Sequence, residues 1–142
     1  MKSKFHGIFS FTLMSLSYLL AIVIVYNSSV NFALLYILVI FVSSFLIVYS
    51  FCTKCACRGK GCAHLLPGKL AGLLPKREQG EYSKLDIVGT IVGITAIISF
   101  PQYWLWQQKI VFVVFWVVQI IAVLEVKCFV CGQCENHICV FK

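Results

Sequence analysis

The chain has 142 residues, of which 61% are hydrophobic and only 12% are charged. Soluble domains carry about 25% charged residues, so this composition excludes an ordinary soluble fold and indicates an integral membrane protein. The net charge of +7 would suit nucleic acid, anionic lipid or membrane topology, and the positions of the charges decide among them.

Two uncharged apolar stretches, about 8–26 and 32–51, open the chain. The hydrocarbon core of a bilayer needs roughly 20 helical residues, and only a helix satisfies its backbone polar groups there. We therefore predict two transmembrane helices joined by a short turn, Asn27–Asn31. The basic start resembles that of a signal peptide, but the apolar run is long and no small-residue cleavage site follows it, so we expect a retained helix.

A loop that contains four cysteines follows the second span, within 52–86. Its cysteines are Cys52, Cys55, Cys57 and Cys62, which gives the spacing C-x2-C-x-C-x4-C. Two residues between cysteines let both thiolates face one metal ion, so this segment is predicted to bind metal.

The middle of the same loop is rich in leucine, with proline and glycine breaks and basic residues. We predict an interfacial segment lying on the headgroups, with Lys69, Lys76 and Arg77 directed toward anionic lipid. Ser83, followed three residues later by Asp86, predicts a capping box where the chain re-enters the bilayer.

The third and fourth spans are predicted at about 87–106 and 110–126, joined by the turn Gln102–Lys109. Pro101 falls inside the outer end of the third span. The third span also carries Gly89-x-x-x-Gly93, a spacing of small residues that lets two membrane helices approach closely.

The tail, 128–142, carries a second group of four cysteines. Cys128, Cys131, Cys134 and Cys139 have the spacing C-x2-C-x2-C-x4-C, which differs from that of the first group by one residue. The matched spacing predicts an internal repeat: two helical hairpins in tandem, each ending in a four-cysteine motif and related by a pseudo-two-fold axis along the membrane normal. The fold class is therefore all-α integral membrane, with residues 1–142 forming a single domain.

The basic residues are strongly biased to one side of the predicted membrane. The side of the termini and the long loop holds Lys2, Lys4, Lys54, Arg58, Lys60, Lys69, Lys76, Arg77, Lys84, Lys127 and Lys142, whereas the short-turn side holds only Lys109. This bias predicts a multi-pass protein of the plasma or inner membrane, with both termini and both cysteine groups cytoplasmic. It also accounts for most of the net charge, so no nucleic-acid partner is needed.

Cytoplasmic cysteines stay reduced, so metal is favoured over disulfides. The tail motif approaches ferredoxin spacing and indicates an iron–sulfur cluster, while zinc remains the alternative, with His64 and His137 as possible replacement ligands. Zinc could also bridge the repeats through Cys52, Cys55, Cys128 and Cys131. We expect Lys54 and Lys127 to help neutralise an anionic cluster.

Three functions follow from these patterns. The first is iron–sulfur electron transfer at the membrane, with a larger redox complex or a quinone as partner. The second is a structural or assembly protein stapled by zinc, and the third is a quinone-linked thiol–disulfide oxidoreductase. The sequence shows no phosphate-binding loop, nucleophile–base pair or paired carboxylates, and its five acidic residues leave little for hydrolase chemistry.

Overall fold

The computed structural model describes residues 2–55, 65–75, 77 and 82–131, and these are helical almost throughout. Four long helical segments are long and apolar enough to cross a membrane: Phe5–Ser28, Val30–Lys54, Lys84–Gln107 and Lys109–Cys131. The protein is therefore an all-helical, multi-pass membrane protein, as the sequence predicts.

The helices at the short-turn end of the bundle are joined by very short connections. Helix α1, Lys2–Ser28, and helix α2, Val30–Ser50, are separated by Ser29 alone, so the expected turn is shorter than predicted. The third span is also interrupted: α4, Lys84–Ser99, ends before Pro101 and the short helix α5, Gln102–Gln107, follows. The expected loop 102–109 is thus mostly helical, because proline has no N–H to continue the ladder of α4 but is tolerated where a new helix begins.

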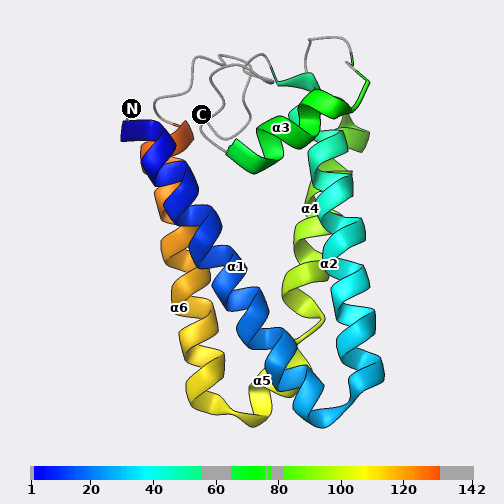
Figure 1. Ribbon diagram of the computed structural model, residues 1–142, viewed down its shortest axis with the longest axis vertical. Helices are drawn as coiled ribbons and strands as arrows, with labels where there is room; N and C mark the ends of the chain where they lie inside the picture. The colour runs from blue at the N-terminus through cyan, green and yellow to red at the C-terminus, as the bar shows by residue number, and fades with distance from the viewer. Residues whose placement is uncertain (1, 56–64, 76, 78–81, 132–142) are drawn as a thin grey trace.

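The remaining elements gather at the opposite end (Figure 1). The 3-10 turn η1, Cys52–Lys54, extends α2, and the π-helical turn η2, Val126–Cys131, extends α6, Lys109–Glu125. Helix α3, Leu65–Leu73, lies across this end, where α1 also begins. We call it the cysteine end, because it holds every described cysteine.

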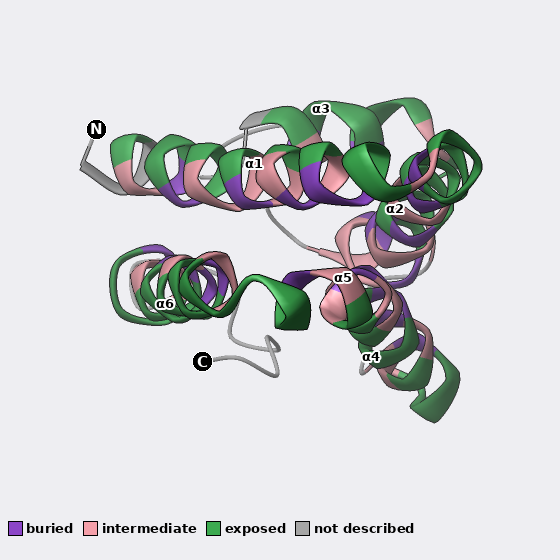
Figure 2. Cartoon of the chain, turned by 90° about the horizontal axis from the view of Figure 1, so that it is seen from below, coloured by how far each residue is buried: buried purple, intermediate pink, exposed green. Residues whose placement is uncertain are grey.

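The helices pack as two pairs that the predicted hairpins do not anticipate. The closest neighbours are α2 with α4 and α1 with α6, so each pair combines one helix from each half of the chain. Figure 2 shows the same pairing from below, with α5 near the middle. Helices α4 and α6 are not among the closely packed pairs, so the two spans of the second predicted hairpin do not pack along each other.

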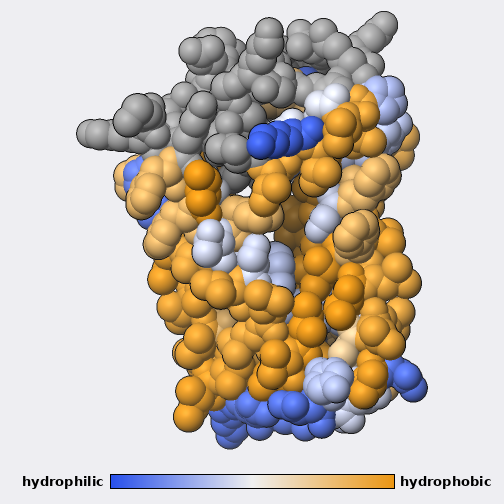
Figure 3. All heavy atoms as spheres, in the orientation of Figure 1, coloured by the Kyte–Doolittle hydropathy of each residue, from blue (hydrophilic) through white to orange (hydrophobic). Residues whose placement is uncertain are grey.

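The largest apolar core sits at the short-turn end and joins both pairs. Its buried members come from four helices: Ala21, Ile24, Tyr36, Leu105 and Phe115. Toward the cysteine end, α1 and α2 diverge, and α3 bridges the space between them (Figure 1). The surface of the spans is a broad apolar belt (Figure 3), as expected of side chains that face lipid.

Candidate functional site

The first described cysteine pair is held by the tight turn that ends α2. Cys52 opens η1, and the Cys55 N–H donates to the Cys52 carbonyl at 3.3 Å. Between them, Thr53 is buried and its hydroxyl donates to the Tyr49 carbonyl at 2.6 Å. These bonds satisfy backbone groups at the helix end and fix the turn, so both half-buried thiols are carried on a defined segment.

An ion-pair cluster anchors this turn to the start of α4. Asp86 is buried, and its carboxylate accepts from Lys54 Nζ at 2.7 Å and from Arg77 NH1 at 2.6 Å. The Arg77 guanidinium also lies 5.2 Å from the centre of the Tyr49 ring. Two cations on one buried carboxylate form a charge-assisted network that ties the segment containing Cys52 and the long loop to the same helix end.

The predicted capping box is present and is part of this cluster. The Asp86 N–H donates to the Ser83 hydroxyl oxygen at 3.3 Å, and the Ser83 N–H donates to the Asp86 carboxylate at 3.0 Å. Asp86 therefore caps α4 and pairs with two cations at once. Both Lys54 and Arg77 pair with Asp86, and their expected roles beside a metal cluster and beside lipid stay predictions.

The second described cysteine pair lies on η2, where the chain leaves α6. Cys128 is exposed, whereas Cys131 is half-buried beside the buried Val130. Single π-helical turns within helices are rare and occur often at functional sites, because the wider turn changes which side chains share a face. The geometry of the two cysteine pairs is therefore different, although both follow C-x2-C spacing.

A histidine on α1 fixes the position of η2, and the sequence patterns did not predict it. The His6 Nδ1–H donates to Glu125 Oε2 at 2.8 Å, and the His6 ring stacks on Phe129 with centroids 4.5 Å apart. The sequence did hold a signal for this pair: His6 is the sole histidine at the cysteine end of the first span, and Glu125 is the sole glutamate at the cysteine end of the fourth span. Glu125 thus pairs with His6.

The structure brings the described cysteines to one end but not into one cluster. Within residues 2–55, 65–75, 77 and 82–131, no group of three or more His, Cys, Asp or Glu side chains could hold a metal ion. Zinc shared by Cys52, Cys55, Cys128 and Cys131 is therefore not preformed. The other candidate ligands lie outside the described residues: Cys57, Cys62, His64, Cys134, His137 and Cys139.

Comparison of the chain with protein-family models, with curated proteins and with solved structures finds no match.

Proposed function

We propose that this chain is a membrane-anchored metal–thiolate protein whose two four-cysteine motifs hold iron–sulfur clusters and pass electrons at the cytoplasmic face. The observation that carries the proposal is that Cys52, Cys55, Cys128 and Cys131 all lie at one end of the bundle, directly after α2 and α6. Two clusters at one face suit transfer between a soluble donor and a membrane acceptor such as a quinone.

Two separate sites fit this arrangement better than one shared site. Each C-x2-C pair belongs to a different helix pair, and each is anchored by its own carboxylate, Asp86 or Glu125. Each quartet would be completed by the two later cysteines of its own motif, Cys57 with Cys62 or Cys134 with Cys139. Four thiolates from one short segment are the usual ligand set of such clusters.

A structural zinc protein is the second candidate. The ion pairs Lys54–Asp86 and His6–Glu125 already clamp the ends of α2 and α6, so metal bound there would reinforce existing anchors. Zinc takes four thiolates in tetrahedral structural sites and contributes directly to folding stability. In this case, chelation would lower thermal stability without changing any redox signal.

The test is to purify the full chain anaerobically in detergent and to measure iron, zinc, acid-labile sulfide and the visible spectrum. We expect iron and sulfide with a brown absorbance shoulder at about 400 nm, as thiolate-bound clusters show. Cys55→Ser and Cys131→Ser should each remove roughly half of the iron, because each breaks one of two quartets. Thr53→Ser is the matched control, since it keeps the hydroxyl that binds the Tyr49 carbonyl.

Zinc without sulfide would replace electron transfer with the structural role, provided that chelation also lowers the melting temperature. If the purified chain contains neither iron nor zinc, both candidates are overturned and thiol–disulfide chemistry is left. Labelling by a membrane-impermeant thiol reagent applied to intact cells would then be decisive, because an oxidoreductase acting on exported proteins needs external cysteines.

A further inference from the structure

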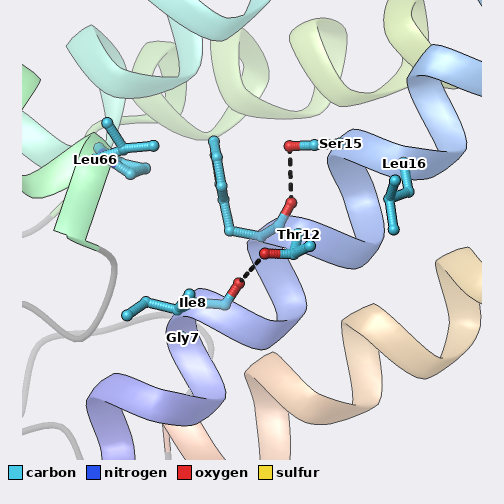
Figure 4. Close-up of a pocket in the computed structure, with 8 residues that line it drawn as sticks. Gly7, Ile8, Thr12, Ser15, Leu16 and Leu66 are labelled. Atoms are coloured by element: carbon cyan, nitrogen blue, oxygen red, sulfur yellow. Dashed lines mark hydrogen bonds between the residues drawn. The ribbon is translucent and has the colours of Figure 1, made fainter.

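A groove lies in the corner between the first half of α1 and the start of α3 (Figure 4). Its volume is about 310 Å³, and its walls are Gly7, Ile8, Phe11, Thr12, Ser15 and Leu16 of α1 with Leu66 and Pro67 of α3. Figure 3 shows the surface hollowed between the two helix pairs beneath α3. The groove exists because α1 and α2 diverge here and α3 covers only part of the space.

The polar side chains of the groove are already satisfied within α1. The Thr12 hydroxyl donates to the Ile8 carbonyl at 2.9 Å, and the Ser15 hydroxyl donates to the Phe11 carbonyl at 2.8 Å (Figure 4). The remaining walls are hydrocarbon, proline, aromatic ring and glycine. A polar ligand would lose its hydration here without gaining hydrogen bonds, so the groove suits a flexible apolar chain.

The position of the groove supplies such a chain. The apolar span of α1 begins at Phe5, so the groove lies beside the first helical turns that enter the hydrocarbon core at the cysteine end. Helix α3 exposes Leu66, Leu70 and Leu73 along one stripe, whereas Ala71 is buried against the protein. A helix with that pattern lies in the interface, with its leucines in the acyl layer, and so borders the groove at headgroup level.

The charge of α3 selects the headgroup. Lys69 is exposed and is the sole charged residue of α3. Among the described residues, the acidic side chains are Asp86 and Glu125, and both are engaged in ion pairs. Lys69, two residues after the groove-lining Pro67, therefore gives α3 a positive charge that attracts an anionic headgroup over a neutral one.

We propose that the α1–α3 groove binds one acyl chain of an anionic phospholipid, with the headgroup beside Lys69. This site is independent of any metal at the cysteines. Bound there, the lipid fills the wedge between the helix pairs and completes the packing of α3 against α1.

The experiment uses the full chain in phosphatidylcholine vesicles containing a small fraction of phosphatidylglycerol with a photoreactive diazirine in one acyl chain. After irradiation, mass spectrometry locates the labelled residues, and photoreactive phosphatidylcholine serves as the comparison lipid. We expect the anionic label to concentrate on 7–16 and 66–67. We also expect an excess of about fivefold over the neutral lipid, the size that one lysine near the membrane surface supports.

Two variants test the binding of the acyl chain and the binding of the headgroup separately. Ser15→Phe fills the groove and should abolish the concentrated labelling, whereas Leu19→Phe, on the lipid-exposed face of the same helix, should leave it unchanged. Lys69→Gln leaves the groove intact, so labelling should persist while the preference for the anionic lipid falls toward one. That result would stand even if the filled variant folded poorly.

Three results would overturn the proposal. Labelling spread evenly over the exposed leucines of α2 and α6 would mean bulk lipid only. Equal labelling of the unmodified protein by the anionic and the neutral lipid would show that no site selects the headgroup. Displacement of the label by a short-chain quinone, but not by unlabelled phosphatidylglycerol, would assign the groove to a quinone instead.

Discussion

The two helix pairs solve the same packing problem with different chemistry. In the α2–α4 pair, a Cβ added to Gly93 would lie 2.9 Å from Ile47 Cγ1 and 3.2 Å from the Ser43 carbonyl oxygen. In the α1–α6 pair, the Gln119 side chain donates to the Ser17 hydroxyl at 2.7 Å in the buried interface. The α2–α4 pair thus combines close backbone approach with a bond from the Tyr36 hydroxyl to the Ile97 carbonyl at 3.2 Å, whereas the α1–α6 pair has a hydrogen bond between side chains.

The ends of the two pairs differ in the same way. Asp86 closes the first pair and is only 4% exposed, with two cations and a serine around it. Glu125 closes the second pair, with His6 as its one ion-pair partner among the described residues, and these side chains are 20% and 26% exposed. The segment with Cys52 is therefore anchored by a more buried carboxylate with more partners than the segment with Cys128. Matched substitutions should lower the stability of the two pairs unequally.

Changing each terminal carboxylate to its amide tests this difference most strongly. Asp86→Asn should lower the free energy of unfolding by about 3 kcal/mol, because it removes the buried carboxylate that pairs with the partly buried Lys54 and Arg77. Glu125→Gln should cost below about 1 kcal/mol, because the His6–Glu125 pair is more exposed to water. Unfolding by sodium dodecyl sulfate in mixed micelles, followed by circular dichroism, measures both. Equal losses would refute the proposed asymmetry.

Substituting the close-contact glycine is expected to have the next largest effect. Gly93→Leu should destabilise the protein by about 2 kcal/mol, because the added side chain overlaps Ile47 and the backbone of α2. Gly72→Leu is the control, since no atom of the described residues lies within 4 Å of the position of an added Cβ at Gly72. The control should be neutral or slightly stabilising, as leucine favours helix over glycine. A stable Gly93→Leu protein would mean that α2 and α4 do not depend on close approach.

Local features of this fold were readable from the sequence because they depend on few neighbouring residues. The spans follow from length and polarity, the capping box follows from Ser83 and Asp86, and the spacing of Gly89 and Gly93 correctly marked a close contact. In each case the physical cause lies within one helix or one turn.

Helix partners could not be predicted in the same way. Every span is apolar on all sides, so hydropathy does not say which faces meet. The partner of Gly93 is set by the backbone at Ser43, and the partner of Gln119 is Ser17 on a helix more than 100 residues away in sequence. The ion pairs of Lys54 and Arg77 likewise depend on the path of the long loop. Motif spacing therefore named candidate metal ligands, but not the cations and carboxylates that position them.

The smallest predicted effect concerns the hydrogen bond of the α1–α6 pair. A double-mutant cycle of Gln119→Leu and Ser17→Ala should give a coupling energy of about 0.6 kcal/mol, since the unfolded helices in a membrane also find partners for polar side chains. Gln102→Leu, at the short-turn end, is the control for Gln119→Leu. Among the described residues, the Gln102 side chain bonds the Trp116 indole N–H at 3.2 Å and the Ile98 carbonyl at 2.6 Å, and not Ser17. It should therefore show no coupling with Ser17→Ala. Coupling as large as the loss in Gly93→Leu would place the main anchor of the bundle in this pair. No coupling would leave α1 and α6 joined by apolar packing and by His6–Glu125, and α1 would then be the helix most easily displaced.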